Sequence, residues 1–249
     1  MLIPVVTAAT VEYWPGVVAL YNSFRQNAGP GFEFYAILYG EKLQARGRAL
    51  GLNVLQPPDW MDQYPTSSEW PKQTPATYAR LVLPTLFPDR ERVIWLDADC
   101  IITKPLAELA SMQFSEVVAA VRFDTEPYTM GNQVRNVPPA MRDLRMPFNG
   151  LLVFNVAEWN RQRITEQCRE AMTKTNLVFQ FADQSVLGYV LRGRFHGLEY
   201  RWQIFANRHG QEIPRNAVIL HWVGTLSSTP WMKHCHHQAE WDKYAAATE

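Results

Sequence analysis

The stretch that decides the fold of this chain is Val93-Ile94-Trp95-Leu96-Asp97-Ala98-Asp99, a short apolar run that leads directly into two aspartates. The run predicts a buried strand, and the aspartates stand where that strand ends. Carboxylates rarely lie deep in a core unless they are paired or bound to a metal. Because alternate side chains of an extended backbone share a face, Asp97 and Asp99 are expected to reach one ion together. A hard divalent cation, Mg²⁺ or Mn²⁺, suits two such carboxylates and can in turn hold phosphates.

Strand-like and helix-like segments alternate along the rest of the chain. Apolar runs predict strands at 3–8, 32–39, around 54, and at 93–96, 117–121, 151–156 and 217–220. Helical spacing of apolar residues predicts helices at 15–24, 42–50, 74–82, 159–174 and 183–191. This alternation predicts an α/β fold with a mostly parallel central sheet flanked by helices. We expect a single domain over 1–249, with about 232–249 as a C-terminal tail or helix.

Composition narrows the classes of function. The 249 residues carry a formal net charge of zero, which argues against a nucleic-acid binder with a broad basic surface. The three cysteines are far apart in sequence and make no disulfide framework, so we expect a reducing compartment, the cytoplasm. The N-terminus reads as a first strand, and no run of about 18 apolar residues predicts a transmembrane segment.

Polar groups follow three of the predicted strands. Thr7, Ala8, Ala9 and Thr10 stand at the end of the first strand, the two aspartates follow the central one, and His221 follows the last. In open α/β sheets, ligands bind beyond the carboxyl ends of the strands. These three strand ends therefore predict one binding crevice.

Four further segments accompany the first one along the chain, in the order Thr77-Tyr78-Ala79-Arg80-Leu81, Phe148-Asn149-Gly150-Leu151-Leu152-Val153-Phe154-Asn155, Ala182-Asp183-Gln184-Ser185-Val186-Leu187, and His221-Trp222-Val223-Gly224 with Pro230-Trp231. Together with Val93–Asp99, this ordered set resembles the motifs of the family 8 glycosyltransferases, the group that includes glycogenin and bacterial lipooligosaccharide galactosyltransferases. The resemblance covers nearly the whole chain.

The resemblance implies a GT-A fold with a Rossmann-like nucleotide-binding half. It also implies retaining transfer of a hexose from a nucleotide-sugar donor, in most relatives a UDP-sugar, to a glycan, lipid-linked or protein acceptor. The implied cation is Mn²⁺, with Mg²⁺ as the alternative, because an imidazole beside two carboxylates suits Mn²⁺ better. Oligomeric state is left open, with a homodimer among the arrangements.

The resemblance also implies roles for individual residues. The metal ligands would be Asp97, Asp99 and His221. The donor-binding residues would be Thr7, Ala8, Ala9, Thr10, Tyr13, Arg80, Asp97, Ala98, Asp99 and Gly224. Asn149, Asp183 and Gln184 would surround the transferred sugar. Gln184 would stabilise an oxocarbenium-like state, with the acceptor hydroxyl attacking from the side of the leaving group. The segment Phe123–Pro147 would cover the donor.

One departure from the family pattern keeps a second function open. The lysine of the closing motif is absent, and Thr229 stands before Pro230-Trp231. Two alternatives follow: Lys233 substitutes from a shifted loop, or the metal carries more of the charge. The alternative is a degenerate sugar-nucleotide or glycan-binding protein without transferase activity.

Other classes fit the sequence less well. A haloacid-dehalogenase-type phosphatase needs a downstream acidic pair that the sequence lacks, and a nucleotidyltransferase needs a Gly-rich basic loop where Thr7–Thr10 stands. The run His234-Cys235-His236-His237 matches no zinc spacing and is interpreted as an exposed tail helix.

Overall fold

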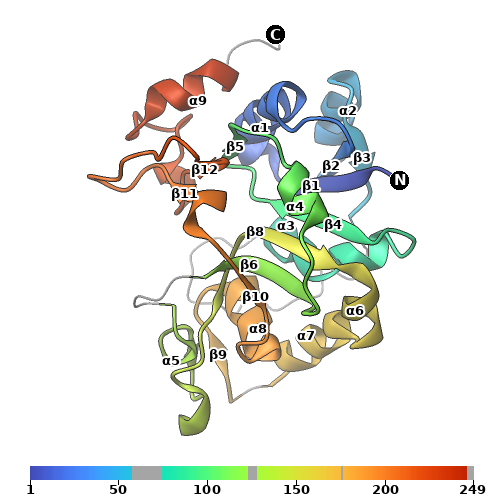
Figure 1. Ribbon diagram of the computed structural model, residues 1–249, viewed down its shortest axis with the longest axis vertical. Helices are drawn as coiled ribbons and strands as arrows, with labels where there is room; N and C mark the ends of the chain where they lie inside the picture. The colour runs from blue at the N-terminus through green and yellow to red at the C-terminus, as the bar shows by residue number, and fades with distance from the viewer. Residues whose placement is uncertain (58–74, 123–127, 175, 246–249) are drawn as a thin grey trace. The chain divides into compact units, whose positions relative to one another are not determined.

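The computed structural model of the protein describes residues 1–57, 75–122, 128–174 and 176–245 (Figure 1). They form two compact units, each assembled from separate stretches of sequence. The first unit comprises Met1–Gln56, Trp95–Met112 and Tyr200–Glu249, and the second comprises Pro57–Ile94 and Gln113–Glu199. The assignment of one domain to 1–249 stays a prediction.

The first unit is built on parallel strands alternating with helices. Strand β1 is parallel to β2, and β2 is parallel to β3, while β12 pairs with β11 in parallel and with β5 in antiparallel orientation. Pro15 stands in the first turn of α1, where its missing N–H leaves no helical bond unmade. The elements of this unit are β1 (Ile3–Ala9), η1 (Val11–Tyr13), α1 (Trp14–Asn27), β2 (Phe32–Leu38), α2 (Glu41–Ala49), β3 (Asn53–Leu55), β5 (Cys100–Ile102), α4 (Ala107–Ser111), η6 (Tyr200–Trp202), β11 (Ile204–Phe205), β12 (Ile219–His221), η7 (Leu226–Ser228) and α9 (Gln238–Ala245).

The second unit places helices around a smaller set of strands. Strand β6 pairs with β8 in antiparallel orientation and with β10 in parallel orientation, β7 pairs with β9, and α7 packs beside α8 (Figure 1). Its elements are α3 (Pro75–Tyr78), η3 (Ala79–Leu81), η4 (Leu83–Leu86), β6 (Val118–Arg122), α5 (Met130–Gln133), β7 (Val134–Arg135), η5 (Pro139–Met141), β8 (Pro147–Asn155), α6 (Val156–Arg161), α7 (Ile164–Met172), β9 (Val178–Phe179), α8 (Ala182–Leu191) and β10 (His196–Leu198).

Strand β4 (Arg92–Leu96) carries the apolar run that precedes the two aspartates. It is buried along its whole length, as the apolar run predicts, and the division between the two units falls within it. The prediction of an α/β fold with mostly parallel strands is confirmed: among the described strand pairs, β1–β2, β2–β3, β6–β10 and β11–β12 are parallel.

Two predicted helices are wrong in extent. The helix expected at 74–82 is α-helical only over Pro75–Tyr78 and continues as the 3₁₀ turns η3 and η4. Pro84 explains this change, because its ring clashes with the carbonyl four residues earlier and it has no N–H to donate. Thr74, the expected N-cap, lies outside the described residues. The helix expected at 159–174 is two helices, α6 and α7, separated at Arg163, whose φ of 56° is left-handed.

Several strands differ from the sequence prediction. The strand expected at 151–156 begins at Pro147, because the pairing with β6 extends beyond the apolar run. The last strand is displaced from 217–220 to Ile219–His221, so His221 is its final residue. The described part of the segment expected to cover the donor contains α5, β7 and η5, whereas 123–127 lie outside the described residues. Strands β5, β7, β9, β10 and β11 have only two or three residues each and give no periodic signal.

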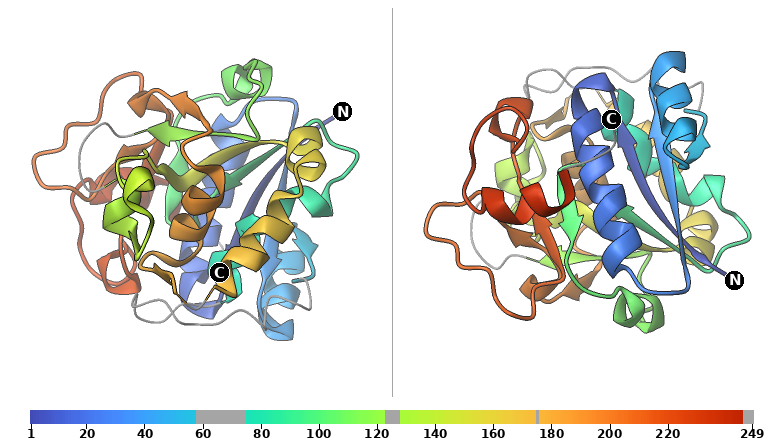
Figure 2. Two further views of the ribbon diagram at one scale, coloured as in Figure 1. Left: turned by 90° about the horizontal axis from the view of Figure 1, so that it is seen from below. Right: turned by 90° about the horizontal axis from the view of Figure 1, so that it is seen from above.

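The C-terminal helix is part of the core of the first unit. Helix α9 lies beside α1, as the right-hand view of Figure 2 shows. Trp241 is 1% exposed, and its ring packs edge-on against Trp222 with centroids 5.2 Å apart. The exposed tail helix expected at His234–His237 is therefore wrong: this segment is a turn before α9, and Cys235 within it is buried. In the described part of the chain, no helix has the length and apolar composition needed to cross a membrane.

Candidate active site

The two aspartates of the central motif lie on a turn between β4 and β5. The backbone N–H of Cys100 donates to the carbonyl of Asp97 at 3.1 Å and closes this turn. The expectation that Asp97 and Asp99 alternate along an extended backbone is therefore wrong, because the strand ends at Leu96. The turn brings the side chains toward the same imidazole by a different route. The N–H of Trp222 also donates to the carbonyl of Asp99 at 3.0 Å and joins the turn to the end of β12.

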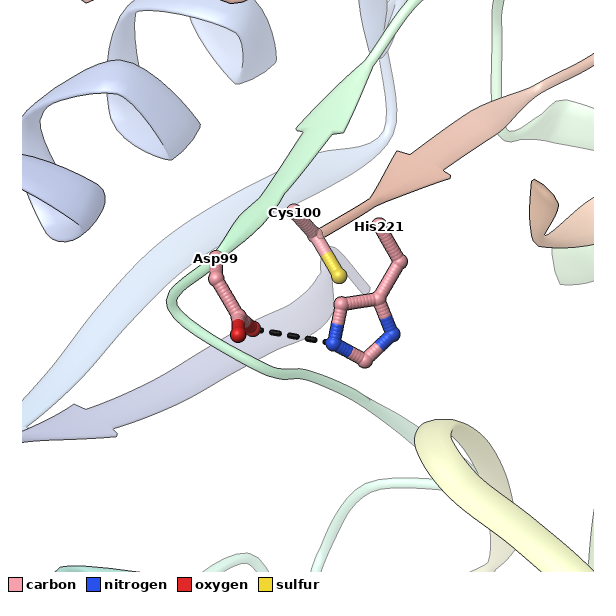
Figure 3. Close-up of side chains that lie close together, drawn as sticks. All are labelled: Asp99, Cys100 and His221. Atoms are coloured by element: carbon pink, nitrogen blue, oxygen red, sulfur yellow. Dashed lines mark ion pairs between the residues drawn. The ribbon is translucent and has the colours of Figure 1, made fainter. Parts of the chain in front are cut away.

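His221 meets the turn through a pairing between strands that are far apart in sequence. In the antiparallel pair β12–β5, His221 is the direct partner of Cys100. Its Nε2 atom lies 2.9 Å from Oδ1 of Asp99 (Figure 3). The same atom lies 3.7 Å from Oδ2 of Asp97. The structure thus brings together all three side chains expected to bind a metal.

Two neighbouring residues fix the shape of this turn. Trp95 Nε1 donates to Oδ1 of Asp97 at 2.9 Å and orients that carboxylate. Gly16, in the first turn of α1, lets the turn approach the helix closely. A Cβ at Gly16 would lie 2.5 Å from the carbonyl oxygen of Ala98 and 2.9 Å from the ring of Trp231. Sequence reasoning missed both contributions, since a glycine within a helix gives no signal of what packs against it.

The acidic groups of the site favour positive charge beside them. Burial lowers the pKa of the His221 imidazole, but Cys100 and Asp99 beside it raise that pKa well above its usual value. Burial, followed by the charges of Asp99 and Asp97, raises the pKa of the Tyr13 hydroxyl far above its usual range. Burial also raises the pKa of the Cys100 thiol to about 11.

The donor atoms present fit a divalent cation. A carboxylate oxygen of Asp99, Sγ of Cys100 and a ring nitrogen of His221 lie within 4.8 Å of one another, and all three residues are buried. Asp97 adds a second carboxylate beside the imidazole. Carboxylate oxygens with one imidazole nitrogen form a donor set that Mn²⁺ accepts.

The predicted donor-binding residues of the first unit occupy different environments. Thr7, Ala8 and Ala9 are buried within β1, whereas Thr10 is half-buried at the start of η1. Tyr13 is half-buried and meets the ring of Trp231 edge-on, with centroids 5.7 Å apart. Ala98 is buried within the aspartate turn. Among the predicted donor-binding residues of the N-terminal segment, Thr10 and Tyr13 are thus the ones whose side chains solvent reaches.

The closing motif contains Gly224, whose backbone conformation requires glycine. Gly224 has a φ of 134°, and a Cβ there would collide with Oγ of Ser228. Thr229, which stands where the resemblance implies a lysine, is fully buried, and its hydroxyl donates to the carbonyl of Leu226 at 2.6 Å. Lys233 is exposed.

A second set of predicted site residues forms a buried polar cluster in the second unit. Nε of Arg80 lies 2.9 Å from Oδ2 of Asp183, and its Nη1 donates to the carbonyl of Asn149 at 2.6 Å. The Asn149 side-chain amide donates to the same Asp183 oxygen. All three residues are at most 6% exposed. The structure therefore brings together one arginine and two residues expected to contact the sugar.

Gln184, at the start of α8, is held by a residue that sequence reasoning missed. Its Nε2 atom donates to Oε1 of Gln133 at 3.0 Å, and Gln133 on α5 is 1% exposed. The backbone just before Gln184 is strained, since Ala182 has a φ of 46°. Gln133 lies in the segment expected to cover the donor, but nothing in the sequence pairs it with Gln184, because the two residues are 51 positions apart.

Comparisons with known proteins agree with this architecture. The sequence model of glycosyl transferase family 8 matches residues 4–235. The chain is 24% identical to the mouse protein named glycosyltransferase 8 domain-containing protein 1, over 97% of this chain and 76% of that protein. The solved structure of the galactosyltransferase LgtC, in complex with donor and acceptor sugar analogs, has a TM-score of 0.74 at 20% identity and covers 99% of this chain and 98% of its own.

The fold also occurs as part of a longer protein. The bifunctional glycosyltransferase WbbM matches with a TM-score of 0.73 at 18% identity, over 99% of this chain but only 50% of WbbM. The likeness to LgtC identifies the fold as GT-A. Because the family model covers most of the sequence, the chain belongs to glycosyl transferase family 8 and is a glycosyltransferase.

Proposed function

We propose that this chain is a retaining, Mn²⁺-dependent transferase that moves a hexose from a UDP-sugar to an acceptor hydroxyl in the cytoplasm. The observation that carries the proposal is the meeting of Asp97, Asp99 and His221, with the His221 imidazole 2.9 Å and 3.7 Å from the two carboxylates. Family membership supports a nucleotide-sugar donor and an acceptor.

In this proposal, Asp97, Asp99 and His221 hold the cation, and Trp95 keeps Asp97 in place through its indole N–H. When bound, the cation supplies positive charge that stabilises the leaving diphosphate. Tyr13 stacks on the base, and Thr10 donates to its edge. A divalent cation would relieve the mutual repulsion of the carboxylates, which is the electrostatic reason to expect tight binding here.

The cluster in the second unit is assigned to the transferred sugar. Asp183 accepts from a sugar hydroxyl, while Arg80 and Asn149 hold and orient its carboxylate. Arg80 is also a proposed contact to the donor. Gln184 uses its amide NH₂ to bond Gln133, so its carbonyl oxygen is the end that faces positive charge at the anomeric carbon. An amide oxygen stabilises such charge without being a strong nucleophile. This assignment favours attack by the acceptor hydroxyl from the face of the leaving group, which retains configuration.

Thermal unfolding with nucleotides tests the donor assignment. We would measure the midpoint with UDP, GDP, ADP and CMP, each with and without Mn²⁺, on wild type and Asp99→Asn. A ligand at 100 times its Kd stabilises the folded state by about 2.7 kcal/mol. The expected result is a Mn²⁺-dependent shift with UDP that Asp99→Asn removes. The absence of a shift with all four nucleotides would overturn the proposal.

Product analysis tests the reaction. Wild type incubated with UDP-hexoses and Mn²⁺ should release UDP, and the anomeric coupling of the product, read by NMR, should match that of the donor. An inverted product would contradict the retaining mechanism.

The buried Thr229 favours the second candidate, a sugar-nucleotide-binding protein without transferase activity, because a short threonine cannot offer the charge of the family's lysine. This candidate predicts the UDP shift without release of UDP from any UDP-hexose.

A further inference from the structure

A cysteine points into the same cluster as the proposed metal ligands. Cys100 is the first residue of β5 and the direct antiparallel partner of His221 on β12. Directly opposite residues of an antiparallel pair project their side chains on the same face, with Cβ atoms about 5 Å apart. Asp99 immediately precedes Cys100, and Figure 3 shows the carboxylate, the sulfur and the imidazole directed toward one another. The strand register itself therefore places a sulfur atom beside the imidazole.

The three donor atoms are close enough to converge on one ion. They lie within 4.8 Å of one another, and all three side chains are buried. Tetrahedral coordination with bonds of about 2.0–2.3 Å places ligand atoms about 3.5 Å apart, so small side-chain rotations suffice. The Asp99–His221 pair is already at 2.9 Å. The side-chain amide of Gln203 donates to the Cys100 sulfur at 3.7 Å and limits how that side chain turns.

We propose that Asp99, Cys100 and His221 form a binding site for a thiophilic divalent cation, Zn²⁺, Co²⁺ or Cd²⁺, with the Cys100 sulfur as a ligand. Thiolate and imidazole select zinc-like ions, whereas carboxylate oxygens suit Mn²⁺ and Mg²⁺. On binding, a sulfur–metal bond forms and the thiol proton passes to solvent, with no change of oxidation state. Three protein ligands leave a fourth position to water, as in open zinc sites.

This mode of binding differs from the one proposed for the donor. There the two carboxylates and His221 act together, and here Cys100 takes the place of Asp97. Both modes need Asp99 and His221, so the two kinds of cation exclude each other. The inference concerns the site of the proposed function, but it rests on the geometry of the cluster, and its test needs no sugar nucleotide.

Absorption spectroscopy with Co²⁺ tests the proposal directly. A cobalt–thiolate bond gives a sulfur-to-metal charge-transfer band in the near ultraviolet, which oxygen and nitrogen ligands do not give. We expect the band in wild type, its loss in Cys100→Ser, and its retention in Cys168→Ser. Cys168 is a matched control, because it is also fully buried but lies on α7 in the second unit. Addition of Zn²⁺ should bleach the band at one equivalent.

Wild type without the band, or a band that survives in a folded Cys100→Ser variant, would overturn the proposal. Should Cys100→Ser not fold by circular dichroism, Cys168→Ser and Cys235→Ser decide instead: a band kept in both supports Cys100 as the ligand, and a band lost in either contradicts it. The test is separable from the proposed function. A cobalt band without a Mn²⁺-dependent UDP shift supports the thiophilic site and overturns the donor assignment. A Mn²⁺-dependent UDP shift without a cobalt band supports the donor assignment and overturns the thiophilic site.

Discussion

The side-chain amide of Gln184 donates a hydrogen bond of 3.0 Å to Oε1 of Gln133, a residue that is almost completely buried. The same Gln133 accepts at its backbone carbonyl from the N–H of Gln180 at 3.0 Å, so α5 is tied to the segment before α8. Helix α5 therefore sets the direction in which Gln184 points.

Replacing Gln133 by Leu should lower kcat by about ten- to 100-fold, because the Gln184 amide, to which we assign a catalytic role, loses its fixed orientation. The KM for the donor should change little, since Gln133 is not a proposed donor contact. Gln133→Glu keeps an acceptor oxygen at the same place and should retain most of the activity. Steady-state kinetics on the three proteins checks this, and equal losses in both variants would show that Gln133 acts only through folding.

Gly16→Ala should weaken Mn²⁺ binding by about 10–100-fold, as a disturbance of the groups that orient metal ligands commonly does. Alanine is the better helix former by up to about 1 kcal/mol, so helix propensity alone predicts a gain in stability. The added methyl group, however, would push on the carbonyl of Ala98 within the aspartate turn. Isothermal titration with Mn²⁺ measures the effect.

Gly31→Ala is the control for that experiment. Gly31 has a φ of 95°, and nothing lies within 4 Å of a Cβ there, so its substitution strains the backbone without touching the turn. It should lower stability and leave Mn²⁺ affinity unchanged. Equal Mn²⁺ affinities for Gly16→Ala and wild type would show that the turn can move away from α1.

Arg80→Ala should lower the free energy of unfolding by about 3–5 kcal/mol, because it leaves the buried Asp183 carboxylate without its cation. Arg161 on α6 forms an exposed ion pair with Glu158, and Arg161→Ala should have little effect. Urea denaturation of the two variants compares them. The double variant Arg80→Ala, Asp183→Asn should recover part of the lost free energy of unfolding. If it recovers none, Arg80 stabilises the protein through packing and not through its charge.

The thiols should react slowly in the folded protein at neutral pH. All three cysteines are buried, and burial raises the pKa of the Cys100, Cys168 and Cys235 thiols. A rise in the pKa of a thiol reduces the fraction of reactive thiolate at neutral pH. Thiolate at Cys100 should therefore appear only as the pH approaches 11. Titration with Ellman's reagent should give three thiols in denaturant and almost none without it. A fast reaction of the thiols in the folded protein would contradict their burial.

The strands that carry apolar runs were predictable because burial on both faces leaves a local signal. The segments around β1, β2 and β4 are such runs, and their ends carry the polar residues that open α/β sheets place toward ligands. The motifs of the aspartate turn and of His221 were likewise visible as short segments in order. Short strands such as β5 and β11 were not, since two or three residues show no period.

The sequence by itself indicated which residues to expect at the site: two carboxylates, one imidazole, and the Arg80, Asn149 and Asp183 group. Only the tertiary structure decided how they are held. The aspartates lie on a turn, and the pairing of β5 with β12 brings Cys100 against His221, a residue 121 positions later. The packing of α5 beside α8 supplies Gln133. Local patterns reflect burial and backbone period, whereas partners distant in sequence are selected by packing and strand register, which no single segment encodes.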